Sequence, residues 1–369
     1  MKFTISRAVL LKPLQIVSGV VERRQTLPIL SNILVAVSGN KLSLTGTDLE
    51  IELVGFASLD KEIEDGATTV AARKLLDICR ALPDEADLHF SMDGEQVTLR
   101  SGKSRFTLST LPAKDFPSIE NSTYPTQFEI GQSRLKKLIS KVYFAMGQQD
   151  VRHYLNGALF DIDRGVIKCI ATDGHRLAYS MIDSVDTGNK STRVILPRKS
   201  VLEVMRLLEV TGEENITVCI SDSHFRLVSP HFVFTSKLIN AQYPDYNKLI
   251  PKAINNIAVA SRDALKQALT RASILSNEKF RGIRLHFDKD ALKIVANNPE
   301  QEEAEELIHL DYQGNGMELG FNAAYLLDVV STIATDNIRC SFNDPNAGVL
   351  IEAYDKDDAS LYVVMPMRL

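Results

Sequence analysis

The residues best suited to catalysis lie in the segment ATDGH, where Asp173 and His175 place a carboxylate and an imidazole two positions apart. On a β-strand that spacing puts both side chains on the same face, as general acid/base catalysis could require. The sequence contains no GxSxG, Walker A, HExxH or GxGxxG motif and no paired Cys and His nucleophile. A hydrolase using Asp173 and His175 is therefore a weakly supported alternative, and we expect a protein that is not an enzyme.

Cysteine usage points away from redox and metal chemistry. Cys79, Cys169, Cys219 and Cys340 lie far apart among apolar neighbours, with no CxxC and no Cys/His cluster. We predict reduced core residues, no disulfide, no metal site and no cofactor.

Length and composition fit a soluble protein of several domains. At 369 residues, and about 150 residues per domain, we expect two or three domains. Apolar residues make up 44%, and no segment approaches the roughly 20 apolar residues that span a bilayer. The N-terminal segment is interrupted by Lys2, Arg7, Lys12 and Pro13, so it lacks the apolar stretch of a signal peptide. We expect a cytoplasmic protein with no membrane association.

The elements that position any site recur three times along the chain. Segments beginning at Phe3, Phe128 and Ile257 each predict a short strand, a serine cap and an amphipathic helix. The caps would be Ser6, Ser133 and Ser261, which gives spacings of 133 − 6 = 127 and 261 − 133 = 128. Each helix precedes a predicted hairpin, with turns at Gly39-Asn40, Asp163-Arg164-Gly165 and Asp288-Lys289-Asp290. A second strand and helix then follow in each third.

Two segments rich in Pro and Asn, 112–127 and 240–256, separate the repeats. We therefore predict domains at 1–126, 127–254 and 255–369. The fold class is α+β, with two helices of each domain packed on antiparallel sheet.

Charge is distributed unevenly although its sum is only −5. Acidic residues gather in DLEIE, DKEIED, EQEEAEE and DKDD, whereas five of the six helical stretches are basic. Their cations are Arg7, Lys12, Arg73, Lys74, Arg80, Arg134, Lys136, Lys137, Lys141, Arg198, Lys199, Arg206, Lys266 and Arg271. A shared basic helix face would contact phosphates without reading base sequence. Two alternatives stay open: a merely solvated helix face, and a scaffold that binds only proteins, whose function would survive neutralising that face.

The order of short motifs carries a further indication. TLPILSN, LSLTGTDLE, RSGKSRFTLSTLPAKDFP, QDVRHYLNG, ATDGHRLA, ILSNEKFRG, ANNPEQEEAEE and YVVMPMRL occur in sequence. In these the chain resembles, over its whole length, the β subunit of bacterial DNA polymerase III, the β sliding clamp family. The resemblance implies DNA-clamp (processivity-fold) domains in a head-to-tail homodimeric ring that encircles duplex DNA and slides along it. The implied partners are the polymerase III α subunit, the clamp-loader δ subunit, and other polymerases and repair proteins with a clamp-binding motif.

The resemblance also implies three sites. DNA contacts would be Arg24, Arg73, Gln149, His153 and Tyr154. A pocket for partner peptides would comprise Leu155, Thr172, Gly174, His175, Arg176, Leu177, Pro244, Lys248, Leu249, Asn346, Gly348, Val363, Met365, Pro366, Met367, Arg368 and Leu369. The dimer interface would pair Lys103, Arg105, Phe106 and Leu108 with Ile274, Leu275, Glu300, Glu302, Glu303, Glu305 and Glu306.

Several of these positions also have plainer interpretations. VVMPMRL reads as a buried final strand, and the charged runs read as protected edge strands. The sequence departs from the family pattern at His153, Lys248, Leu249, Asn346 and Gly348, which bears on DNA or peptide preference.

Overall fold

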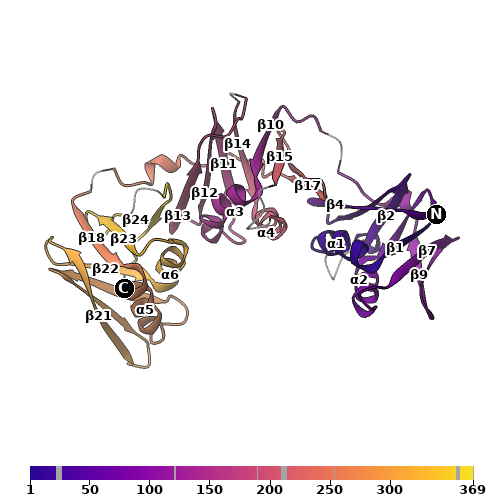
Figure 1. Ribbon diagram of the computed structural model, residues 1–369. Helices are drawn as coiled ribbons and strands as arrows, with labels where there is room; N and C mark the ends of the chain where they lie inside the picture. Colours follow the sequence, from indigo (N-terminus) through magenta and orange to yellow (C-terminus); the bar gives the residue numbers. More distant parts are fainter. Residues whose placement is uncertain are drawn as a thin grey trace. The chain divides into compact units, whose positions relative to one another are not determined.

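The computed structural model of the chain describes residues 1–21, 27–119, 122–188, 190–208, 214–252, 254–354 and 358–368 (Figure 1). The chain forms two compact units, Met1–Ser133 with Leu202–Leu238, and Arg134–Val201 with Ile239–Leu369. Each unit is built on one continuous antiparallel sheet. No helix in the described part of the chain is both long enough and apolar enough to cross a bilayer.

The first unit contains a sheet of 13 strands within the described residues. In spatial order they are β10 (Thr126–Gly131), β15 (Asn215–Ile220), β16 (His224–Val228), β17 (Phe232–Lys237), β4 (Ile51–Ser58), β3 (Lys41–Thr47), β2 (Asn32–Ser38), β6 (Gly66–Ala71), β9 (Ser104–Leu111), β8 (Gln96–Ser101), β7 (Asp87–Asp93), β1 (Lys2–Ser6) and β5 (Lys61–Glu64). The β17–β4 pair, with Phe232 opposite Gly55, joins strands from the predicted first and second thirds.

The second unit contains a sheet of 12 strands, again counted within the described residues. Their order is β14 (Ser191–Pro197), β11 (Gly157–Asp163), β12 (Val166–Thr172), β13 (Arg176–Ile182), β25 (Leu361–Val364), β24 (Val349–Ala353), β23 (Asn337–Phe342), β18 (Asn256–Ser261), β21 (Glu303–Tyr312), β20 (Ala291–Asn297), β19 (Gly282–Asp288) and β22 (Met317–Asn322). Here β13 pairs with the last strand, β25, so the C-terminal strand joins the strands of the predicted second third to those of the predicted last third.

Six α-helices pack on these sheets in the described residues. They are α1 (Arg7–Val17), α2 (Ala72–Ala81), α3 (Gln132–Ser140), α4 (Arg198–Leu207), α5 (Arg262–Ser273) and α6 (Ala323–Thr332). In the first unit α1 lies beside α2, and in the second α5 lies beside α6 (Figure 1). The helix α1 also contacts β3 and β4, and α5 contacts β20 and β21. Gly55 permits the close approach of α1, because a Cβ there would lie 2.9 Å from Pro13 Cβ. The predicted α+β architecture is confirmed.

Two of the three predicted helix caps are confirmed. The Ser6 side chain accepts a hydrogen bond from Val9 N, and the Ser261 side chain accepts one from Ala264 N. The Ser133 prediction was wrong, because α3 already begins at Gln132. There β10 stays paired with β15 through Gly131 and the helix follows at once, so it begins two residues before the Arg134 that a Ser133 cap implies. The three predicted hairpin turns join β2 to β3, β11 to β12 and β19 to β20.

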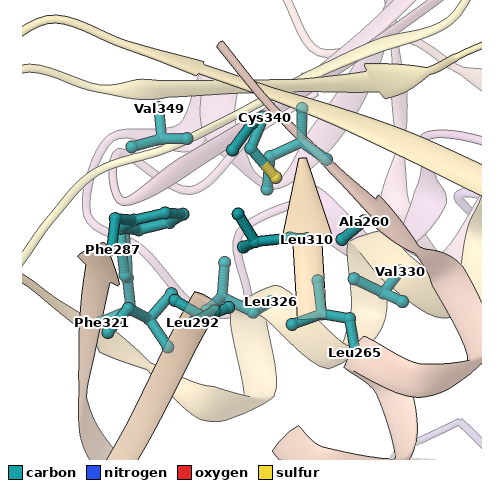
Figure 2. A pocket seen from close by; sticks show the side chains of 13 residues that line it. Ala260, Leu265, Phe287, Leu292, Leu310, Phe321, Leu326, Val330, Cys340 and Val349 are labelled. Carbon is teal, nitrogen blue, oxygen red and sulfur yellow. The ribbon is translucent and has the colours of Figure 1, made fainter. Parts of the chain in front are cut away.

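The core of the third repeat is apolar throughout. Leu265 from α5 and Leu326 and Val330 from α6 meet Phe287, Phe321 and strand neighbours around a void of about 20 Å³ (Figure 2). A void of that size lined by apolar groups stays dry and marks packing, not a ligand site.

Short 3₁₀ turns complete the elements. They are η1 (Pro28–Ser31), η2 (Ala113–Asp115), η3 (Tyr143–Ala145), η4 (His153–Leu155) and η5 (Tyr246–Lys248). The last three lie in the second unit, close in sequence to the predicted pocket residues.

Candidate functional site

An apolar cluster in the second unit contains residues from several of the predicted pocket segments. Leu177 and Val363 are cross-strand neighbours on β13 and β25, and each is at most 3% exposed. Partly buried side chains, among them Tyr154, Tyr243 and Leu361, pack against the cluster. A buried apolar floor with a partly exposed apolar rim is the kind of surface on which an apolar peptide side chain can be buried.

The predicted pocket residues differ in exposure. Leu155, Thr172, Leu177 and Val363 are buried; Arg176, Pro244, Gly348, Pro366 and Met367 are half-buried; Gly174, His175, Lys248, Leu249, Asn346, Met365 and Arg368 are exposed. Leu369 lies outside the described residues. We call the described members of this set the candidate peptide site.

Asp173 and His175 lie in a turn and not on a strand, so the predicted shared strand face was wrong. The strand β12 ends at Thr172 and β13 begins at Arg176. Asp173 Oδ1 accepts hydrogen bonds from His175 N at 2.9 Å and Arg176 N at 3.0 Å, and Oδ2 accepts one from Arg176 Nε at 3.1 Å. Gly174 supplies the positive φ of 88° that this turn requires. The Asp173 carboxylate therefore holds the turn, which is a structural role.

Arg176 anchors the same turn to neighbouring elements. Its side chain is only 10% exposed, and Nη1 donates to Asp328 Oδ2 of α6 at 2.5 Å. Nη2 donates to the carbonyl of Phe144 in η3 at 2.7 Å, and the guanidinium lies 4.5 Å from the ring centroid of Tyr325. Because the guanidinium is already engaged by these partners, Arg176 positions the turn and does not present a free cation to a peptide.

The C-terminal segment is held across the candidate peptide site by its backbone. Met365 N donates to His175 O and Met367 N donates to Gly320 O, both at 2.8 Å. A Cβ at Gly348 would lie 2.7 Å from Val363 Cγ1 and 3.1 Å from Met365 Sδ. The glycine therefore leaves space over Val363, and the flexible, 42% exposed Met365 can adapt to what enters it.

The predicted DNA-contacting loop, residues 149–154, is held in shape by local hydrogen bonds. Asn156 bridges it, because Asp150 N donates to Asn156 Oδ1 at 2.9 Å and Asn156 Nδ2 donates to Asp150 O at 2.8 Å. Hydrogen bonds from Arg152 lower the pKa of Asp150 to about 2. Gln149, at a φ of 56°, and His153 are exposed. Tyr154 instead packs edge-on against Tyr243, with ring centroids 6.3 Å apart, and belongs to the rim of the apolar cluster.

The other predicted DNA contacts lie in the first unit. Arg73 is exposed in the first turn of α2 and, with Arg80, lines a surface depression of about 300 Å³. Arg24 lies outside the described residues. Four of the helical cations form ion pairs within the described residues, Arg7 with Asp84, Lys141 with Asp358, Arg206 with Glu203 and Arg271 with Glu306. The net positive charge of the helices is therefore smaller than the sequence count indicates.

Two strands expose an unpaired edge over part of their length. In the described chain β9 pairs with β8 but meets β6 only through Thr110 and Leu111, which leaves 104–109 open on one side. Likewise β21 pairs with β20 over 303–309, and β18 covers it only from Leu310 onward. Open edges of this kind template pairing with another strand.

The predicted interface residues lie on or beside these two edges. Lys103 and Arg105 are exposed, Phe106 is half-buried and Leu108 is buried. Ile274 is 74% exposed, Leu275 is half-buried, Glu300, Glu302, Glu303 and Glu305 are exposed, and Glu306 is half-buried. Glu306 is held by Arg271 at 2.6 Å, which lowers the pKa of Glu306, and Glu305 is 2.7 Å from Lys293. The acidic strand thus has less uncompensated charge than its sequence implies.

Sequence reasoning missed several residues near the candidate peptide site. Asp328 could most easily have been recognised, because it is the one charged residue in the helix segment AAYLLDVVST. Tyr243 and Tyr246 flank the predicted Pro244, and their aromatic spacing in QYPDYN also offered a clue. At the predicted interface, Leu307, 69% exposed on the open edge of β21, was also not singled out among its glutamate neighbours.

The cysteines and acidic residues show no arrangement for metal or redox chemistry in the part of the chain that is described. No group of three or more His, Cys, Asp or Glu there could hold a metal ion. The four thiols are free, and burial raises the pKa of Cys79 to about 11 and that of Cys340 to about 12. These groups are therefore protonated at neutral pH.

Comparison with protein families gives three matches in order along the chain. Residues 1–120, 129–245 and 247–368 match the N-terminal, central and C-terminal domains of the DNA polymerase III beta subunit. The beta sliding clamp of Pseudomonas aeruginosa is 50% identical over 370 residues and that of Escherichia coli 48% over 369, each comparison covering 100% of both chains.

Solved structures agree with these relatives. The crystal structure of the P. aeruginosa DNA polymerase III subunit beta has a TM-score of 0.97 at 49% identity, covering 100% of both chains. A P. aeruginosa sliding clamp bound to griselimycin has a TM-score of 0.96 at 49% identity, again with complete coverage of both chains.

Proposed function

The chain belongs to the family of the DNA polymerase III beta subunit, the non-enzymatic sliding clamps that serve as polymerase processivity factors, and from this premise we propose how its own residues do that work. Two copies close head to tail into a ring around duplex DNA. The candidate peptide site tethers polymerase and other factors to that ring. The observation that carries the proposal is the unbroken match along the entire chain.

We propose that DNA contacts are few and weak. Arg73 and the rigid loop with Gln149 and His153 offer a cation and polar groups to phosphates, with no arrangement for reading bases. A closed ring retains DNA by topology, so attachment lasts until the ring opens and does not depend on phosphate affinity. Weak contacts also permit sliding. Arg24 and Tyr154 remain proposed DNA contacts because of the family resemblance. Tyr154 also packs against the apolar cluster.

We propose that the dimer seam joins the open edge of β9 in one copy to that of β21 in the other. Antiparallel pairing would satisfy the exposed backbone groups of both edges. Phe106 and Leu108 would bury Ile274 and Leu275, while Lys103 and Arg105 meet the glutamates. Because this contact uses two different surfaces, it closes only if the rotation between copies completes a ring.

The candidate peptide site is proposed to bind short linear motifs of the polymerase III α subunit, the clamp-loader δ subunit and other polymerases and repair proteins. Its apolar floor at Leu177 and Val363 and the adaptable Met365 support binding of several related peptides. The departures at Lys248, Leu249, Asn346 and Gly348 lie in exposed or half-buried positions of the rim, where they would change peptide preference and leave the floor intact.

Domain limits and location complete the proposal. Domains at 1–126, 127–254 and 255–369 are supported by the three matched family segments. A cytoplasmic location is supported by the four free cysteines, which suit a reducing compartment.

The test is primer extension on singly primed circular single-stranded DNA with polymerase III core and clamp loader from a relative. Adding this protein should change short products into products that run the length of the circle in one binding event. A double variant, Arg73→Ala with Gln149→Ala, should load less well. Full loading of that variant at physiological salt would favour the protein-only scaffold, and unchanged product length with the native chain would refute the function.

A further inference from the structure

The segment 241–249, here called the wall loop, carries Pro244, Lys248 and Leu249 of the candidate peptide site. Behind it lies a cavity of about 360 Å³, lined by Leu159, Arg193, Ile195 and loop residues Ala241–Asn247. A cavity of this volume has room for water, so along it the loop is not packed directly on β11 and β14. The loop is held against β11 and β14 by contacts beside the cavity, and one of these is polar.

Tyr246 supplies that interaction. It is 3% exposed, its ring belongs to the apolar cluster with Leu177 and Val363, and its hydroxyl donates to Asp161 Oδ2 at 2.9 Å. Asp161 projects from β11 with a side chain only 6% exposed. Arg193 of β14 donates to both Asp161 oxygens, from Nε at 3.0 Å and from Nη2 at 2.9 Å.

Asp161, Arg193 and Tyr246 stabilise one another. A buried carboxylate is stable only when its oxygens accept hydrogen bonds, and here a bidentate guanidinium and a phenol supply them. Burial, followed by the hydrogen bond to Asp161, raises the pKa of Tyr246, so the phenol remains protonated and able to donate. Arg193 is 67% exposed and covers the carboxylate from the solvent side.

We propose that Asp161, Arg193 and Tyr246 are positioning residues that hold the wall loop in the conformation that binds partner peptides. None of the three need touch the peptide. The inference rests on the proposed function, because it assumes that the candidate peptide site takes peptides. Loss of the anchor lets the loop move into the cavity, and the apparent affinity falls in proportion to the fraction of molecules that keep the competent loop.

The experiment compares peptide affinity among full-length variants. Tyr246→Phe removes one hydroxyl and keeps the aromatic ring; Asp161→Asn removes the charge. Tyr179→Phe is the matched control, because its ring lies 6.1 Å from Tyr246 while its hydroxyl donates to Met181 Sδ and not to Asp161. The probe is a fluorescently labelled peptide with the clamp-binding motif of the polymerase III α subunit, measured by anisotropy where every variant is fully folded.

We expect Tyr246→Phe to raise the peptide Kd about tenfold, as loss of a hydrogen bond to a charged group would. Asp161→Asn should weaken binding at least as much, and the double variant should be no worse than Asp161→Asn alone, because both changes remove the same bond. Tyr179→Phe should change Kd less than about twofold. Backbone amides of the wall loop should exchange hydrogen faster in Tyr246→Phe, while retention on circular DNA stays unchanged.

Two results would overturn the inference in different ways. If the native chain binds the peptide and Tyr246→Phe binds it equally well with unchanged amide exchange, the anchor is unnecessary and the peptide site stands. If the native chain fails to bind the peptide at all, the assignment of the site is wrong, and the inference is refuted with it.

Discussion

Replacing Ile274 by alanine tests the proposed dimer seam with a change that leaves each copy intact. The Ile274 side chain is 74% exposed in the single chain, so its apolar surface gains burial only when another copy covers it. The change removes three carbons, worth about 0.8 kcal/mol each on full burial, or about 1.8 kcal/mol after scaling by the exposed fraction. A ring has two seams, so the dimer loses about 3.6 kcal/mol and its dissociation constant rises several hundredfold.

The assay is sedimentation velocity with fluorescence detection over a range of nanomolar to micromolar concentrations. The matched control is Ile257→Ala, an isoleucine 51% exposed on β18 and outside the proposed seam. It undergoes the same chemical change and should leave the dimer constant as it is. Thermal unfolding of the dissociated Ile274→Ala chain should match that of the dissociated native chain.

A dimer constant for Ile274→Ala within threefold of the native value would refute the seam. Equal weakening by both isoleucine changes would also contradict it, because the effect would then not depend on position. A dimer that survives Ile274→Ala but dissociates when Leu307, 69% exposed on β21, is replaced would move the apolar centre of the contact from Ile274 to Leu307.

Three further outcomes follow from the same geometry. Arg176→Met should lower the unfolding free energy by about 2 kcal/mol in urea titrations, because Asp328 loses a charge-assisted partner; an unchanged midpoint would show that Arg176 is not an anchor. Gly348→Val should weaken binding of the labelled peptide at least about tenfold by crowding Val363, with ring retention on DNA unaffected; normal affinity would remove Gly348 from the site. At pH 8 the Cys79 thiol, with its pKa raised to about 11 by burial, is ionised in about one molecule in a thousand, so Ellman's reagent should label it only after denaturation; rapid labelling of the native chain would contradict the burial.

The repeat, the hairpins and most helix starts could be predicted because they depend on local chemistry. Ser6 and Ser261 each accept a hydrogen bond from an amide three residues later in the chain, and a contact this local can be predicted from the sequence. Ser133 failed as a cap because the pairing of β10 with β15 decides where α3 begins, and that pairing joins residues from 215 − 131 = 84 to 220 − 126 = 94 positions apart.

Contacts between residues far apart in the chain could not be predicted from the sequence. The partner of Arg176 is Asp328, 152 residues away, and no local pattern links the two. The β17–β4 and β13–β25 pairs make each sheet continuous across the predicted domain limits, so the compact units divide the middle repeat. The site residues were reached through family resemblance, because exposed polar residues have no periodic pattern and a buried strand residue such as Val363 has the pattern of any core position.

The most direct measurement is retention of the loaded protein on nicked circular DNA, compared with the same DNA after linearisation, at a salt concentration that removes ordinary phosphate binding. Encirclement predicts that the protein stays on the circles and is lost from the linear ends. Equal retention on both would mean adhesive binding and would contradict the central claim.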